Sequence, residues 1–202
     1  MKNLVRGIAL GVILGAVLLG AARFAATPWE DPVHHHANWA VFVEGERLDL
    51  TADRYMEDVG ACVAGGEVLP TQRIHMHSNE QDVVHVHHPG VTWGHFLTNL
   101  GFVLGKNFLI LDDGRRFEEG EGRTLKFIVN GFAVPEIRNR LVESGDRLLI
   151  SFGSETLEEV ARSQYGRVAE NAEEYNHLQD PATCSGSTEP TFFERLRRAF
   201  WG

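Results

Sequence analysis

The sequence predicts an α+β fold: a small mixed β-sheet with one main packed helix, in a β-grasp-like arrangement. Three observations support this prediction. Short strand-like segments recur between residues 38 and 152, turn signals such as Asn130-Gly131 separate them, and one segment among them has helical spacing. The predicted domain covers residues 34–153, follows an N-terminal transmembrane or signal helix over residues 1–26, and precedes a helical tail over residues 154–202.

The N-terminal segment begins with Lys2 and Arg6, followed by an uncharged apolar run over residues 7–22. Export machinery recognises this pattern, and the positive-inside rule leaves the basic residues in the cytoplasm. The run is shorter than the roughly 20 residues of a comfortable span, but residues 1–26 suffice if Arg6 and Arg23 snorkel. Two interpretations stay open, a cleaved signal peptide and a single-pass anchor. Both place the domain outside the cytoplasm, in the periplasm or at the cell surface.

Three glycines in this segment, Gly7, Gly11 and Gly15, are spaced by four residues. This small-xxx-small pattern lets two membrane helices approach closely, and it indicates a homodimer. Glycine is common in such segments, so the pattern also fits a monomer. A polar linker with two prolines follows over residues 27–33.

The first strands of the domain are expected between Asn38 and Leu50, where two alternating segments flank Glu44-Gly45 and indicate a hairpin. A short helix is expected near residues 51–59. The further predicted strands are 73–77, 83–88, 108–111, 125–129, 132–134 and 147–152.

The main helix is expected to begin after Thr92, because threonine is a favourable N-cap and Pro89-Gly90 breaks the preceding strand. One face of this helix carries Trp93, Phe96, Leu97 and Leu100. Gly101 is expected to end the helix, since glycine adopts the left-handed conformation at helix ends.

The tail changes in character after Gly153. Residues 155–176 are acidic and favour helices, with Ser154 as the expected N-cap. The final segment, TFFERLRRAFWG, places aromatic residues beside three arginines. Such a short helix fits a membrane surface, or it docks its aromatic residues on the domain.

The charge of the chain argues against nucleic acid as a partner. The net charge is −9 and no basic stripe is present that would meet phosphates.

The chain contains two cysteines, Cys62 and Cys184. In an exported protein they predict a disulfide that ties the tail to the domain, and the alternative is two unrelated thiols.

Histidine is the compositional outlier: nine of the ten lie between residues 34 and 95. Six of them form three His-x-His pairs: His34/His36, His75/His77 and His85/His87. Residues i and i+2 of a strand point to the same face of a sheet, so each pair presents two imidazoles on one side.

The two central pairs are expected to face each other across a hairpin centred near Gln81. His77 would then lie opposite His85, and His75 opposite His87, with Cβ atoms about 4.5–5.5 Å apart. Imidazole nitrogens bind zinc at about 2.0–2.1 Å and also suit copper. The sequence therefore predicts a zinc or copper site formed by His75, His77, His85 and His87, with His34 and His36 as further ligands.

Two functions follow from this pattern. One is a membrane-anchored extracytoplasmic protein that buffers, senses or delivers the metal ion. The other is a non-enzymatic envelope scaffold whose histidine-rich face is structural or pH-responsive, since histidine titrates near pH 6.5. His88, on the core side by alternation, and His95, on the helix, are expected to be structural.

An enzyme is not expected. HExxH, Gly-x-Ser-x-Gly, CxxC and phosphate-binding loops are absent from the sequence. A metal-dependent hydrolase would need a carboxylate base, and Glu80 and Asp82 are the candidates beside the histidines.

The three stretches HHHANWAVFVEGERLDL, RIHMHSNEQDVVHVHHPGVTWGHFLTNLGF and TLKFIVNGFAVPEIRNRLVESGDRLLISFG lie within residues 33–153. Together with DPATCSG in the tail, they resemble a family of uncharacterised, membrane-anchored prokaryotic proteins with a histidine-rich extracytoplasmic domain. The resemblance implies a shared fold and location and no assigned activity.

Overall fold

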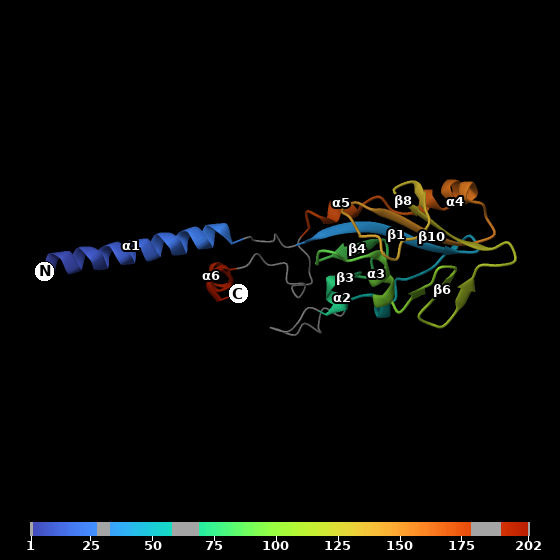
Figure 1. Cartoon of the computed structure of the whole chain (residues 1–202). Helices are drawn as coiled ribbons and strands as arrows, with labels where there is room; N and C mark the ends of the chain where they lie inside the picture. Colours follow the sequence, from blue (N-terminus) through green and yellow to red (C-terminus); the bar gives the residue numbers. More distant parts are fainter. Residues whose placement is uncertain (1, 28–32, 58–68, 179–190, 202) are drawn as a thin grey trace. The chain divides into compact units, whose positions relative to one another are not determined.

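The computed structural model describes residues 2–27, 33–57, 69–178 and 191–201 (Figure 1). These residues belong to two compact units: one contains the helices α1 (Lys2–Ala26) and α6 (Phe192–Trp201), and the other lies within Pro32–Ser187. Cys62 and Cys184, with their predicted disulfide, lie outside the described residues, as does most of the predicted linker.

The larger unit is built on a mixed sheet. Within the described residues its strands are, in spatial order, β3 (Ile74–His75), β4 (Val83–Val86), β1 (His35–Val43), β10 (Arg147–Gly153), β8 (Thr124–Val129) and β9 (Phe132–Val134), with β2 (Glu46–Arg47) paired to β1. β1 and β10 run parallel, whereas the other neighbours are antiparallel. The α+β prediction is confirmed at this level, and the β-grasp-like arrangement stays a prediction.

A second, three-stranded sheet and several short helices complete this unit. The small sheet contains β5 (Val103–Leu104), β6 (Phe108–Ile110) and β7 (Arg116–Glu118). The helical segments are η1 (Asp53–Tyr55), α2 (Pro70–Arg73), α3 (Trp93–Asn99), α4 (Leu157–Ser163), η3 (Tyr165–Arg167) and α5 (Ala172–Tyr175).

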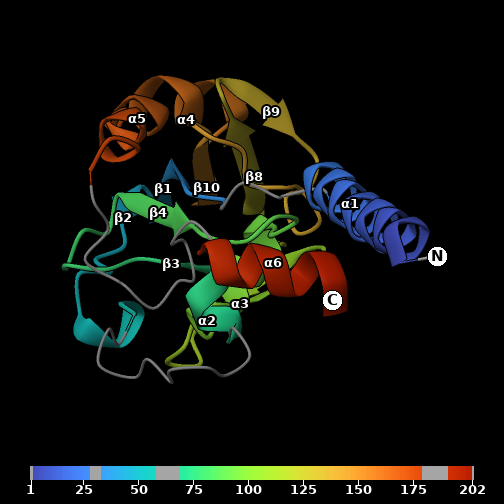
Figure 2. The same ribbon diagram turned by 90° about the vertical axis from the view of Figure 1, so that its left-hand side faces the viewer.

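Both faces of the central strands β1 and β10 are covered. In Figures 1 and 2, α4 and α5 lie on one side of β1 and β10, and α3 lies on the other. Trp39 of β1 faces α3, where its ring meets Phe96 edge-to-face at 4.6 Å. The next strand position, Ala40, faces the opposite way and shares a core cluster with Val160 of α4. Because β1 is buried on both faces, its second half, residues 39–43, is an apolar run and not a clean alternation.

Several local predictions are confirmed. Thr92 is the N-cap of α3, and its hydroxyl accepts a hydrogen bond from His95 N. Gly101, with φ of +78°, follows the end of that helix. Asn130 and Gly131, with φ of +52° and +83°, connect β8 to β9 in the primed turn that suits a hairpin.

Other predictions need correction. The register of the β3–β4 hairpin places His75 opposite His85, not opposite His87. The shift is two residues, so every side chain keeps its expected face. Of the helix expected near residues 51–59, the described part, up to residue 57, forms only the 3₁₀ turn η1, because Ala52 and Met56 on either side are extended. The N-cap of α4 is Thr156, not Ser154, since Thr156 and Glu159 form a reciprocal capping box.

The smaller unit contains two helices with different surfaces. α1 has 25 residues, a mean hydropathy of 2.2 over its most apolar window and no buried residue. It is long and apolar enough to cross a membrane, and a signal sequence would have the same properties. α6 packs near the end of α1: the rings of Phe24 and Phe192 are 5.8 Å apart, and Arg23 Nε donates to the carbonyl of Ala199.

Candidate metal centre

Three neighbouring strands bring histidines from distant parts of the chain onto one face of the sheet. His36 of β1 lies opposite His85 of β4, and His85 lies opposite His75 of β3. Their neighbours Ala37, Val84 and Ile74 point the other way and belong to the core around α3. The sheet therefore holds a row of three imidazoles whose positions are fixed by backbone pairing and by an apolar opposite face.

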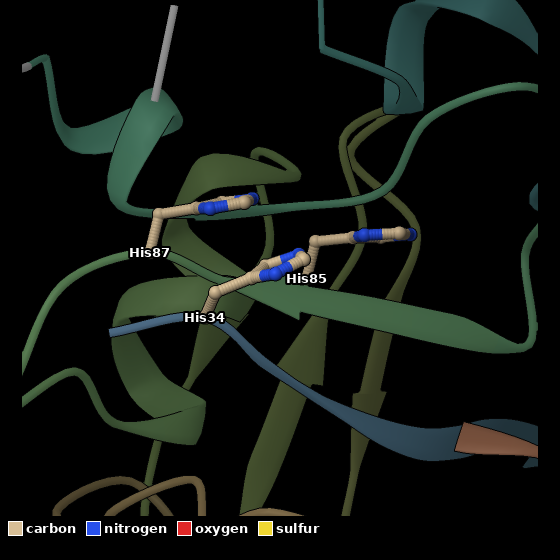
Figure 3. A group of neighbouring side chains, drawn as sticks. All are labelled: His34, His85 and His87. Atoms are coloured by element: carbon tan, nitrogen blue, oxygen red, sulfur yellow. The ribbon is translucent and has the colours of Figure 1, made fainter. Parts of the chain in front are cut away.

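A three-nitrogen group forms beside this row. His34, just before β1, and His85 and His87 from the β4 segment each offer a nitrogen within 4.8 Å of the other two (Figure 3). The His34 and His87 rings are stacked at 5.0 Å. Nitrogens bound tetrahedrally to one zinc ion lie about 3.3 Å apart, given bonds of about 2.0–2.1 Å. The three nitrogens would have to approach one another by up to about 1.5 Å to reach that spacing, and in that arrangement the group could hold a metal ion.

A chain of hydrogen bonds sets the orientation of His85. Nδ1 of His36 lies 2.7 Å from Oδ1 of Asn176, and Nε2 of His36 lies 2.8 Å from Nδ1 of His85. An amide oxygen only accepts, so Nδ1 of His36 donates, and in the neutral ring Nε2 of His36 accepts. His85 then donates through Nδ1, and its Nε2 carries the lone pair. Such a chain behind a ligand is how metal sites fix the tautomer of histidine.

The remaining pair, His75 and His77, is held by other groups. His77 Nδ1 lies 3.0 Å from the hydroxyl of Ser78. His75 Nδ1 lies 3.0 Å from the carbonyl oxygen of Thr71, and its Nε2 lies 3.0 Å from Oε2 of Glu57. The His75 ring is stacked against that of His87 at 5.0 Å, so this pair adjoins the three-nitrogen group.

Helix α5 lies against the same face of the sheet. Asn38, two residues beyond His36 on β1, donates to Oδ1 of Asn171 and accepts from the backbone N–H of Ala172. These bonds fix the start of α5, and its end places Tyr175 against His36 and His85, with ring centroids 5.9 and 6.1 Å away. Burial raises the pKa of Tyr175, and the negative charge of Glu80 raises it further.

The other histidines and the candidate bases lie outside this group. His35 contacts the carbonyl of Val142, His95 is exposed in the cap of α3, and His88 is half-buried beside Pro89 rather than in the core. Glu80 accepts from Asp82 N and from the hydroxyl of Tyr175, while Asp82 pairs with Arg47. Both carboxylates are therefore engaged by other groups.

Sequence reasoning missed Glu57, Tyr175 and Asn176. Glu57 lies 18 positions before His75, and His36 and Asn176 are separated by 140 positions. No local sequence pattern predicts either contact, because both arise from the packing of separate segments onto the sheet. Comparisons of the chain with family models, with characterised proteins and with solved structures find no match.

Proposed function

We propose that the protein is a membrane-anchored, extracytoplasmic metal-binding protein that holds zinc or copper for buffering, sensing or delivery. The observation that carries the proposal is the convergence of His34, His85 and His87 nitrogens within 4.8 Å. Two of these side chains are buried, with relative exposures of 2% for His85 and 7% for His87. The group offers nitrogen ligands, and imidazole nitrogen suits zinc and copper.

The proposed location rests on α1. At about 1.5 Å per residue, a 25-residue helix is about 37 Å long, more than the roughly 30 Å hydrocarbon core. Lys2 and Arg6 at its start favour a cytoplasmic N-terminus. α6 supports membrane attachment as well, because Phe193 and Trp201 are exposed on a helix that carries Arg195, Arg197 and Arg198. The role we propose is binding and not catalysis.

A second candidate function is a structural or pH-responsive scaffold. It is favoured by the hydrogen bonds that His36, His75 and His77 make to Asn176, Thr71 and Ser78. Such bonds stabilise imidazoles without a metal ion. The two candidates differ in whether the folded protein binds an ion tightly.

The test is a titration of the full-length protein in nanodiscs, dialysed against a chelator, with zinc and with copper(II). The wild type is expected to bind at least one ion per chain with submicromolar affinity. His85→Gln removes a ligand, and since even supporting residues change metal affinity about 10–100-fold, this variant is expected to lose at least 100-fold.

The matched control is His95→Gln, at an exposed histidine where glutamine can keep the capping interaction with Thr92. It is expected to bind as the wild type does. If neither metal binds below tens of micromolar, or if both variants bind equally well, the metal proposal is wrong and the scaffold is favoured.

A further inference from the structure

Helix α6 is attached to the end of α1 around one charged residue, Arg23. Nε of Arg23 donates to the carbonyl of Ala199, and its guanidinium lies over the ring of Phe200, 6.0 Å from the centroid. Phe192 packs against Phe24, with ring centroids 5.8 Å apart. These contacts hold α6 beside the last turn of α1.

Arg23 also marks the depth at which α1 leaves the apolar part of a membrane. It is the first charged residue after the uncharged run over residues 7–22. In a helix that crosses a membrane, an arginine at this place snorkels and puts its guanidinium among the lipid headgroups. A helix bonded to Arg23 therefore lies at the membrane surface, on the side away from Lys2 and Arg6.

One side of α6 remains exposed. Phe193, Arg197 and Trp201 are spaced by four residues, so they share one side of the helix. All three are exposed, with relative exposures of 78% for Phe193 and 77% for Trp201. Tryptophan and arginine combine an apolar body with a polar end, and phenylalanine adds apolar area. This combination suits the boundary between acyl chains and headgroups.

The charge of α6 favours anionic lipid. The helix carries three arginines and one glutamate, in a chain whose net charge is −9. The carboxylate of Glu194 accepts from the backbone N–H and the hydroxyl of Thr191 at the start of the helix. Within the part of the chain that the structure describes, Arg197 and Arg198 form no ion pair. Their guanidinium groups match the geometry of a lipid phosphate.

We propose that α6 lies along the extracytoplasmic surface of the membrane and binds anionic phospholipids through Arg197 and Arg198, with Phe193 and Trp201 inserted beside the headgroups. This inference rests on the proposed function, because it assumes that α1 stays in the protein as an anchor. It goes further because it names the lipid class. It also gives the larger unit a second attachment, after Ser187 as well as before Pro32.

The experiment uses the full-length protein in nanodiscs that mix phosphatidylcholine and phosphatidylglycerol. One of the two lipids is brominated on its acyl chains near the headgroup. Bromine quenches nearby tryptophan, and the difference between wild type and Trp201→Phe isolates the signal of Trp201. Brominated phosphatidylglycerol is expected to quench Trp201 more strongly than brominated phosphatidylcholine at the same mole fraction. An arginine near an anionic surface strengthens binding about fivefold, so Arg197→Gln should lower this preference by that factor.

The matched control is Arg162→Gln, which removes the same charge from the exposed side of α4 in the larger unit. It is expected to keep the wild-type preference. Unquenched Trp201 would overturn the membrane contact of α6. Equal quenching by the two lipids, or an unchanged preference in Arg197→Gln, would overturn anionic lipid as the partner.

These results leave the anchor and the metal centre of the proposed function intact. A different result concerns the anchor itself. If the protein purified from its host has the mass of a chain without α1, the anchor and the present inference are refuted together, whereas zinc binding is untouched.

Discussion

Replacing Asn176 with leucine should weaken metal binding although Asn176 contacts no metal ligand of the three-nitrogen group directly. The change removes the oxygen that lies 2.7 Å from Nδ1 of His36. His36 is then free to exchange tautomers, and its Nε2 no longer has to accept from His85. When His85 turns or shifts its proton to Nε2, it loses the lone pair that would bind the ion.

The substitution is expected to have two effects, one on metal affinity and one on the stability of the metal-free protein. Loss of a supporting hydrogen bond lowers metal affinity about 10–100-fold, which is about 1.4–2.7 kcal/mol of binding free energy. His36 is 1% exposed, so its unsatisfied N–H also destabilises the metal-free fold by about 1–3 kcal/mol. Asn176→Asp keeps an oxygen acceptor at the same position and should retain the wild-type affinity or exceed it.

The assay is competition for zinc against a chromophoric chelator, together with urea unfolding of the metal-free protein. Ser144→Ala is the control, because it removes the other side-chain partner of Asn176, 3.2 Å from its Nδ2, without touching His36. If Asn176→Leu lowers the unfolding free energy but leaves zinc affinity at the wild-type value, the hydrogen-bond chain has no role in the metal centre.

Three further predictions concern the fold and the helix α1. Burial alone would raise the pKa of Asp112, but hydrogen bonds from Tyr55 and Arg54 outweigh it and hold this pKa below its usual value. Tyr55→Phe should therefore lower the unfolding free energy by about 1 kcal/mol at neutral pH, measured by urea unfolding. The difference from wild type should shrink below pH 4, because Asp112 is then protonated in both proteins. Val160→Ala should lower the unfolding free energy by about 2 kcal/mol in the same assay, since Val160 is fully buried between α4 and the sheet. An unchanged unfolding free energy would show that the packing of α4 does not contribute to the core. Gly11→Ile should abolish crosslinked dimers of the full-length protein in membranes if the glycine face is a dimer interface, and unchanged crosslinking would exclude that face.

Local chemistry made part of this fold predictable. The Asn130-Gly131 turn and the Thr92 cap depend on residues within a few positions of each other, so the sequence contains the complete signal. The common face of His75 and His85 was also predictable, because strand alternation survives a register shift of two residues. The exact register was not, since it depends on where the hairpin turn closes.

Long-range packing explains what the sequence did not reveal. The parallel pairing of β1 with β10 joins residues about a hundred positions apart, and no local pattern encodes it. The sequence predicts residues 154–202 as a helical tail separate from the domain, yet Val160 and Val168 insert into the sheet core. Because that segment packs there, its continuation brings Tyr175 and Asn176 to the histidines.

The distribution of the centre along the chain has a thermodynamic consequence. His34 and His87 belong to separate strand segments, and Asn176 comes from the far end of the domain, so the arrangement exists only in the folded state. An ion that binds this state and not the unfolded chain stabilises it by about 4.1 kcal/mol when its free concentration is 1,000 times Kd. Loose binding to consecutive histidines such as His34–His36 would occur equally in the unfolded chain and give no such stabilisation. A rise in unfolding free energy with zinc, lost in His85→Gln, is therefore the property that separates an organised centre from adventitious binding.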